Sequence, residues 1–160
     1  MLVEIIHKYL KSGQFISVAT ADGDSQPNSA PKLVYKVENN FIYLVDYILG
    51  RTSKNLRKNP RISLSVMDTD NLEGYRLNGQ VELIEKGKFY DGMVGEFKHK
   101  MISLSANRVI EGLQTGKKHE HFELEIPDKF IFYKIEILEA VKIGRQGQLL
   151  GETRENAANR

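Results

Sequence analysis

Four consecutive residues of types that bind phosphate occur about a third of the way along the chain. The run Arg51-Thr52-Ser53-Lys54 supplies a planar guanidinium, two hydroxyls and an ammonium group. Pro60 disfavours helical geometry in the residue before it, so a helix with Thr52 or Ser53 as its N-cap would have about two turns. Unpaired backbone N–H groups and the positive end of the helix dipole lie at such an N-terminus. The sequence therefore predicts a phosphate site at residues 51–54.

Two flanking stretches favour a functional interpretation of this run. Residues 41–45 are continuously apolar and residues 61–67 alternate apolar and polar, which are the patterns of a buried and a half-buried strand. A basic helix end alone is most often a solvated surface, whereas a short basic helix start held between two strands favours phosphate binding. Lys32, on a preceding strand, is a further candidate cation, although a lysine there could equally protect a sheet edge.

The composition is that of one globular domain of ordinary charge. The 160 residues are 41% hydrophobic, and 23 basic against 21 acidic residues give a net charge of +2, which is too little for a dedicated nucleic-acid binder. We expect residues 1–143 to form a single domain. Residues 144–160 lack apolar periodicity apart from Leu149 and Leu150, and we expect a flexible C-terminal tail there.

The absence of cysteine and the sequence of the N-terminus indicate the cellular compartment of the protein. The chain has no cysteine, which excludes disulfides, thiolate nucleophiles and sulfur-ligated metal centres. Glu4, His7 and Lys8 interrupt the stretch that a secretion signal would need to be apolar, and no apolar run approaches the length of a membrane span. We therefore expect a cytoplasmic protein without membrane contact.

Alternating hydrophobicity predicts a mainly β chain. We expect strands at residues 15–21, 28–37, 41–45, 61–67, 75–83, 122–126 and 130–143. We expect helices at residues 2–12, at about 88–104 and in a short segment that ends near residue 116. Pro31 cannot donate to a sheet ladder, so an edge or a break in pairing is expected there. Six or seven short antiparallel strands with a few flanking helices indicate a small barrel.

Three segments carry a resemblance to a known family. The firmest is Asn55-Leu56-Arg57-Lys58-Asn59-Pro60-Arg61, which the preceding run extends to residues 51–64. The others are an Asp-Gly turn followed by Pro27 and the strand Ser29-Ala30-Pro31-Lys32, and Leu77-Asn78-Gly79-Gln80-Val81-Glu82. Together, over roughly residues 13–86, they resemble the FMN-binding split-barrel family, of which pyridoxamine 5'-phosphate oxidase is the best-known member. The resemblance implies an antiparallel split barrel that forms a homodimer with the flavin at its interface.

The resemblance also implies which residues contact the cofactor. It places the FMN phosphate near Arg51 and Thr52, with Lys32, Ser53 and Asn55 close by. It places the isoalloxazine ring along Ser29, Ala30 and Pro31 and beside Val45, Asp46 and Tyr47. The phosphate element differs from the oxidase's Ser-Arg-Lys, and the basic residues expected near the C-terminus for a substrate phosphate are not found, which argues against oxidation of vitamin B6.

The expected function is that of an FMN-binding flavoprotein, an oxidoreductase that acts on a small organic substrate or electron donor. Because the flavin performs the redox chemistry itself, no acid–base constellation is required, and we assign no catalytic residue. One alternative is a non-catalytic flavin-binding carrier or sensor. Another is a barrel that binds single-stranded nucleic acid, which the small net charge disfavours. Relatives of this barrel also bind deazaflavin F420 or haem, and the sequence leaves that choice open.

Two histidines outside this site raise the question of a metal. His119 and His121 would share a face with Glu123 if their segment is a strand. Such a run is more often the exposed side of an edge strand, and no third distant ligand pattern is visible. We therefore expect no metal site.

Overall fold

The computed structural model describes residues 2–47, 49–115, 129–147 and 149–154. Its chain divides into two compact units, one formed by Met1–Ile84 with Ile131–Arg160 and the other by Glu85–Phe130. The predicted strand at 122–126 and the candidate ligands His119 and His121 lie outside the described residues. No helix among the described residues is long and apolar enough to cross a membrane.

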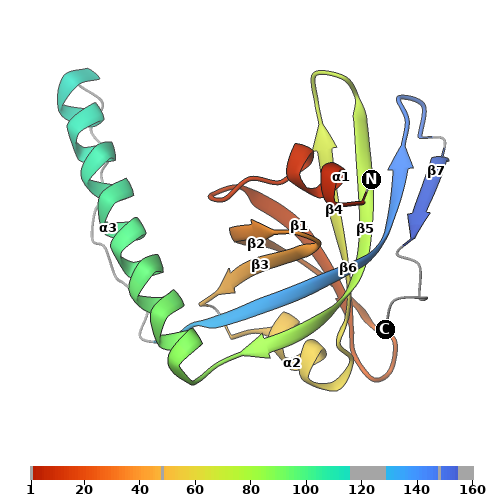
Figure 1. The fold of residues 1–160 in the computed structure, drawn as a ribbon, viewed down its shortest axis with the longest axis horizontal. Coiled ribbons are helices and arrows are strands. Elements are labelled where there is room, and N and C mark those ends of the chain that lie inside the picture. The colour runs from red at the N-terminus through yellow and green to blue at the C-terminus, as the bar shows by residue number, and fades with distance from the viewer. Residues whose placement is uncertain (1, 48, 116–128, 148, 155–160) are drawn as a thin grey trace. The chain divides into compact units, whose positions relative to one another are not determined.

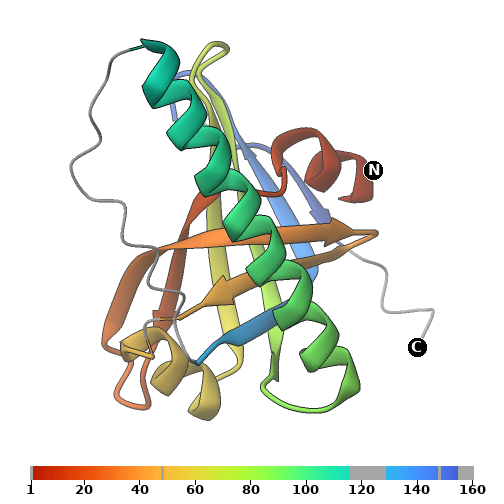
Figure 2. The same ribbon diagram turned by 90° about the vertical axis from the view of Figure 1, so that its left-hand side faces the viewer.

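The first unit is an antiparallel barrel (Figures 1 and 2). Its described strands are β1 (Phe15–Ala21), β2 (Pro27–Glu38), β3 (Phe41–Asp46), β4 (Arg61–Asp68), β5 (Glu73–Ile84), β6 (Ile131–Ile143) and β7 (Leu149–Arg154). They follow the order β3-β2-β1-β4-β5-β6-β7, and a further pairing of β3 with β6 closes the first six into a barrel. This confirms the predicted mainly β fold with a six-stranded antiparallel barrel.

The core follows from the period-2 pattern of the strands. In β1 every second side chain is buried, so Ile16 and Val18 point inward while Ser17 and Ala19 remain exposed. Leu64 of β4 and other inward residues of the barrel are fully buried. The barrel wall therefore has a mainly apolar inner face, whereas its outer face carries small and polar residues together with the exposed Phe15 and Met67.

Pairing at the start of β2 agrees with the expectation for Pro31. β2 pairs with β1 from Pro27 to Leu33, whereas its pairing with β3 begins only at Leu33. Pro31 therefore lies where β2 has a neighbour on one side only, and its missing N–H removes no ladder hydrogen bond.

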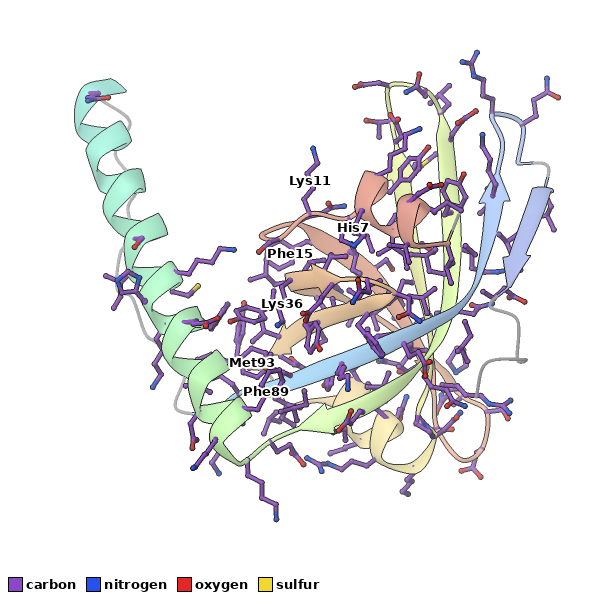
Figure 3. The ribbon with its side chains drawn as sticks, in the orientation of Figure 1. His7, Lys11, Phe15, Lys36, Phe89 and Met93 are labelled. Atoms are coloured by element: carbon purple, nitrogen blue, oxygen red, sulfur yellow. The ribbon has the colours of Figure 1, made fainter. Side chains whose placement is uncertain are left out.

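Two helices belong to the first unit. α1 (Leu2–Tyr9) is shorter than the expected 2–12, and its buried residues are Leu2 and Ile6. The side chains of His7, of Lys11 just after α1, and of Phe15 at the start of β1 are exposed (Figure 3). α2 (Arg51–Lys58) connects β3 to β4 and ends before Pro60, which confirms the predicted two-turn helix.

The second unit contains α3 (Lys88–Thr115). We predicted two helices here, and that prediction is wrong because residues 88–115 are continuously helical. The physical reason is that neither glycine nor proline occurs between Gly95 and Gly112, so nothing in that stretch ends a helix. Within this unit Phe97 and Phe130 pack edge to face, with ring centroids 5.4 Å apart.

The end of the chain contains a strand inside the segment where we expected a flexible tail. Residues Leu149–Arg154 form β7, which pairs antiparallel with Glu139–Ile143 of β6. Sequence patterning did not indicate it because β7 lies beyond the closed barrel, at one end of the strand order, where main-chain pairing needs no alternation of buried side chains. Whether residues 1–143 behave as one domain stays a prediction.

Candidate functional site

Helix α2 begins two or three residues earlier than the sequence predicted. Its N-cap is Gly50, which makes no side-chain capping bond, so the prediction of Thr52 or Ser53 as N-cap is wrong. Both side chains are 3% exposed and turn into the protein, and Ser53 Oγ donates to the carbonyl of Gly50 at 3.0 Å. The Ser53 hydroxyl therefore binds the carbonyl of the N-cap residue, and neither side chain caps the N-terminus of the helix.

The N-terminus of α2 is positively polarised. The first helical hydrogen bond runs from Lys54 N to Gly50 O at 3.3 Å, so the N–H groups of Arg51, Thr52 and Ser53 precede the helical ladder. The first turn contains no acidic residue, and the side chains of Arg51 and Lys54 are exposed. No described residue forms an ion pair with the Arg51 guanidinium. This end of the helix therefore offers an exposed planar cation beside backbone donors that have no partner among the described residues.

A polar network ties α2 to the hairpin of β1 and β2. Asn28 Nδ2 donates to Thr52 Oγ1 at 3.2 Å and to Thr20 Oγ1 at 3.4 Å, and Asn55 Nδ2 donates to Thr20 Oγ1 at 3.2 Å. Thr20, Thr52 and Asn55 are buried. Thr20 and Asn28 were not among the predicted site residues, although a polar residue at an inward position of β1 was the available signal.

Lys32 and Asp46, both predicted to lie near the cofactor, are paired with each other inside the barrel. Lys32 Nζ lies 2.7 Å from Asp46 Oδ1, and Tyr133 donates its hydroxyl to Asp46 Oδ2 at 2.5 Å. The three residues are 9%, 2% and 0% exposed. Asp46 thus links β2 and β6 at the end of β3. Tyr133 was not among the predicted site residues, because only the register of β3 against β6 brings it to Asp46.

The structure separates the residues predicted to lie along the flavin ring. Ser29 and Pro31 are exposed on the outer face of β2, where Ser29 Oγ lies 3.2 Å from Ser17 Oγ, and Ala30 is half-buried. Tyr47, just after β3, is 40% exposed, whereas Val45 is 1% exposed and belongs to the core. Arg51, Ser29, Pro31 and Tyr47 are therefore accessible to a ligand, while Lys32, Val45 and Asp46 are enclosed. Their cofactor roles stay predictions.

Burial raises the pKa of the Tyr133 phenol, and the hydrogen bond to Asp46 and the charge of that carboxylate raise it further. Above the ordinary phenol pKa of 10.0 the unfolded chain releases this proton while the folded chain retains it. A raised folded-state pKa therefore stabilises the fold below pH 10.0, and that stability is lost as the pH rises further. We expect wild type to lose about 1.4 kcal/mol more per pH unit than Tyr133→Phe in this range.

Urea unfolding at a series of alkaline pH values measures this difference. At neutral pH Tyr133→Phe is expected to be less stable by about 1–3 kcal/mol, because Asp46 loses a buried donor. The two stability curves should then converge as the pH rises. Tyr47→Phe, at a 40% exposed tyrosine, is the matched control and should run parallel to wild type. Parallel curves for Tyr133→Phe and wild type would contradict the assignment.

Solved structures share this fold at low sequence identity. HupZ of Group A Streptococcus superposes with a TM-score of 0.60 and 18% identity, covering 94% of this chain and 96% of that one. A pyridoxamine 5'-phosphate oxidase-related, FMN-binding protein of Nostoc punctiforme PCC 73102 gives 0.55 and 12%, covering 96% and 94%. An F420 reductase gives 0.55 and 14%, covering 84% and 94%. At these identities the likeness establishes the common fold.

Sequence comparison agrees with the structural likeness. An uncharacterised protein of Methanocaldococcus jannaschii is 26% identical over an alignment of 93 residues, which covers 55% of this chain and 62% of the relative. The match thus spans less than two thirds of that relative's length. A family model described as pyridoxamine 5'-phosphate oxidase matches residues 2–126, more than half of the chain, and the chain therefore belongs to this family.

Proposed function

We propose that this protein is an FMN-binding flavoprotein and an oxidoreductase that acts on a small organic substrate. The observation that carries the proposal is the N-terminus of α2, where the exposed Arg51 guanidinium lies beside the N–H groups of residues 51–53, which precede the helical ladder and have no partner among the described residues. A phosphate dianion is bound by such a combination of a planar charged donor, backbone donors and a helix dipole. Family membership and the fold shared with an FMN-binding protein give further support.

The residues present fit a phosphate group, but with a smaller set than the sequence suggested. Arg51 and the first turn of α2 would hold the phosphate, while Lys32 is already neutralised by Asp46 and would act only by supporting the end of β3. Exposed Ser29, Pro31 and Tyr47 would offer surface for the ring. The flavin, when bound, supplies the hydride or single-electron chemistry, so the chain's task is to bind and orient it. A homodimer with the flavin at its interface and a cytoplasmic location belong to the same proposal.

Replacing Arg51 tests the phosphate assignment. Arg51→Ala removes one or two charge-assisted hydrogen bonds of about 1.5–3 kcal/mol each, so FMN affinity should fall roughly ten- to hundred-fold. Quenching of flavin fluorescence measures the affinity. Riboflavin lacks the phosphate, so its weaker affinity should not change in the variant.

Lys58→Ala is the matched control, because it removes an exposed cation from the opposite end of α2. It should leave FMN affinity unchanged. Wild-type FMN affinity in Arg51→Ala, or an equal loss for riboflavin, would overturn the assignment. Bleaching of bound flavin by NADH or NADPH, with recovery on adding an acceptor, would support the oxidoreductase. No bleaching by either nucleotide would favour a flavin carrier or sensor, or a different reductant.

F420 is a second candidate cofactor, favoured by the fold shared with an F420 reductase. The same titrations with F420 in place of FMN decide between them. Tighter binding of F420, with the same dependence on Arg51, would keep the phosphate site and replace the flavin.

A further inference from the structure

A separate cavity of about 640 Å³ opens on the outer face of the barrel, across β1, β4, β5 and β6. Its lining includes none of the residues that we predict to contact the flavin. The volume is within the roughly 300–1,000 Å³ range of small-molecule sites. The residues that line it and carry the argument are Ala19, Arg61, Asn78, Gln80, Leu138 and Glu139.

The register of the strands brings these residues together. Ala19 pairs with Ser63, Ser63 with Asn78, and Asn78 with Glu139, so four strands contribute to one row across the sheet. Residues directly opposite in antiparallel strands share a face. Arg61 pairs with Gln80 two residues along on the same face. The cavity is thus lined by positions whose spacing the sheet determines, rather than by loops.

A β-bulge shapes the floor of the cavity. Asn78 pairs with Glu139 and the next residue, Gly79, pairs with Ile137, so Leu138 is skipped. Burial along β6 changes accordingly, because Leu138 and Glu139 are both half-buried between the buried Ile137 and Ala140. A bulge re-aims side chains in this way and is over-represented beside functional sites. Here it turns an apolar and an acidic side chain toward the same cavity.

The charges of the lining indicate the class of ligand. Arg61 is exposed, and no described residue pairs with its guanidinium. Glu139 Oε2 instead accepts a hydrogen bond from Asn78 Nδ2 at 2.6 Å. The guanidinium is therefore available to a planar carboxylate, for which its fork of donors is suited. Ala19, Ala21 and Leu138 provide apolar surface for the body of such a molecule.

We propose that this cavity is a second ligand site, which binds a small organic carboxylate with an apolar body through Arg61. Asn59 and Gln80 add amide groups that orient the ligand's other polar atoms. The site differs from the proposed flavin site in residues and in position, since Arg61 follows α2 and Arg51 begins it. The proposal therefore does not depend on flavin binding.

Indole-3-acetate is a suitable probe, with indole-3-acetamide as its neutral counterpart. The chain contains no tryptophan, so indole fluorescence reports on the probe alone. Titrating the full chain should give saturable binding of indole-3-acetate that is about tenfold tighter than binding of the amide. Arg61→Gln should remove that preference, since it removes the charge but keeps a side chain of similar length.

Arg76→Gln is the matched control, because it removes an exposed arginine of β5 that does not line the cavity. It should bind the probe as wild type does. Arg51→Ala should also bind it normally, and Arg61→Gln should keep normal FMN affinity. Absence of saturable binding, equal affinity for acid and amide, or unchanged binding by Arg61→Gln with an unchanged unfolding midpoint would each overturn the proposal.

Discussion

Replacing Asp46 by alanine is expected to destabilise the protein by about 3–5 kcal/mol, the typical cost of breaking a buried ion pair by removing one partner. The carboxylate is 2% exposed and accepts from both Lys32 Nζ and the Tyr133 hydroxyl. Removing it leaves a buried ammonium without a counter-charge and a buried phenol without an acceptor. Asp46 of β3 contacts side chains of both β2 and β6, so its removal should weaken the β3–β6 pairing that closes the barrel. Urea unfolding of the variant measures the effect.

An exposed ion pair provides the control for Asp46. Glu38 lies 3.2 Å from Lys36 Nζ, and both side chains are more than a third exposed. Glu38→Ala should therefore cost no more than about 1 kcal/mol. The double variant Lys32→Met, Asp46→Leu should recover much of the loss seen for Asp46→Ala, because no unpaired charge stays buried. A cost for Asp46→Ala as small as that for Glu38→Ala would show that the buried pair is not what holds β3 in place.

The barrel could be predicted because its strands carry the period-2 pattern, and α2 because Pro60 limits it. These are local signals, in which each residue's neighbours in sequence decide the structure. The N-cap of α2 was predicted wrongly for the opposite reason. Thr52 and Ser53 have the right chemistry for a cap, but contacts with Asn28 and with Gly50 turn them inward.

In the candidate site, too, local sequence signals could be predicted and contacts between distant residues could not. Arg51 could be identified from its position before a short helix, and it is exposed as a phosphate ligand should be. Lys32 was assigned to the same ligand by residue type, yet its ammonium is bound to Asp46. That pairing depends on the register of β2 against β3, and the hydroxyl of Tyr133 depends on the register of β3 against β6. Cross-strand partners of this kind lie far apart in sequence, where no local pattern specifies them.

The cavity at Arg61 was likewise beyond sequence analysis. It depends on a bulge that skips Leu138, and the run of residues in β6 reads as an ordinary strand. The residue of β5 opposite the bulge is Gly79. In the sequence it is only one small residue in an alternating strand, so it does not indicate the bulge. The structure explains why a side chain is not tolerated there.

Replacing Gly79 by alanine is expected to destabilise the barrel by about 3 kcal/mol, at the upper end of the cost of overpacking. A Cβ at this position would overlap the backbone oxygen of Glu136 and would also lie 3.1 Å from Ile135 Cγ2. The obstacle is backbone held in the β5–β6 ladder, so it cannot rotate away as a flexible side chain would. Relief requires β6 to move at the bulge. The unfolding midpoint in urea, at an unchanged slope, measures the loss.

Alanine substitutions at two other glycines should destabilise the protein less than Gly79→Ala does. A Cβ at Gly74 would lie 2.7 Å from Val66 O, a milder overlap, whereas one at Gly23 meets nothing within 4 Å. Gly74→Ala should therefore cost less than Gly79→Ala, and Gly23→Ala should stay within about 0.5 kcal/mol of wild type. Because β6 must shift to admit the new methyl group, Gly79→Ala should also weaken binding of indole-3-acetate at Arg61, while Gly23→Ala should not. If Gly79→Ala were as stable as Gly23→Ala, the close approach of β5 and β6, and with it the bulge that shapes the cavity, would not exist in solution.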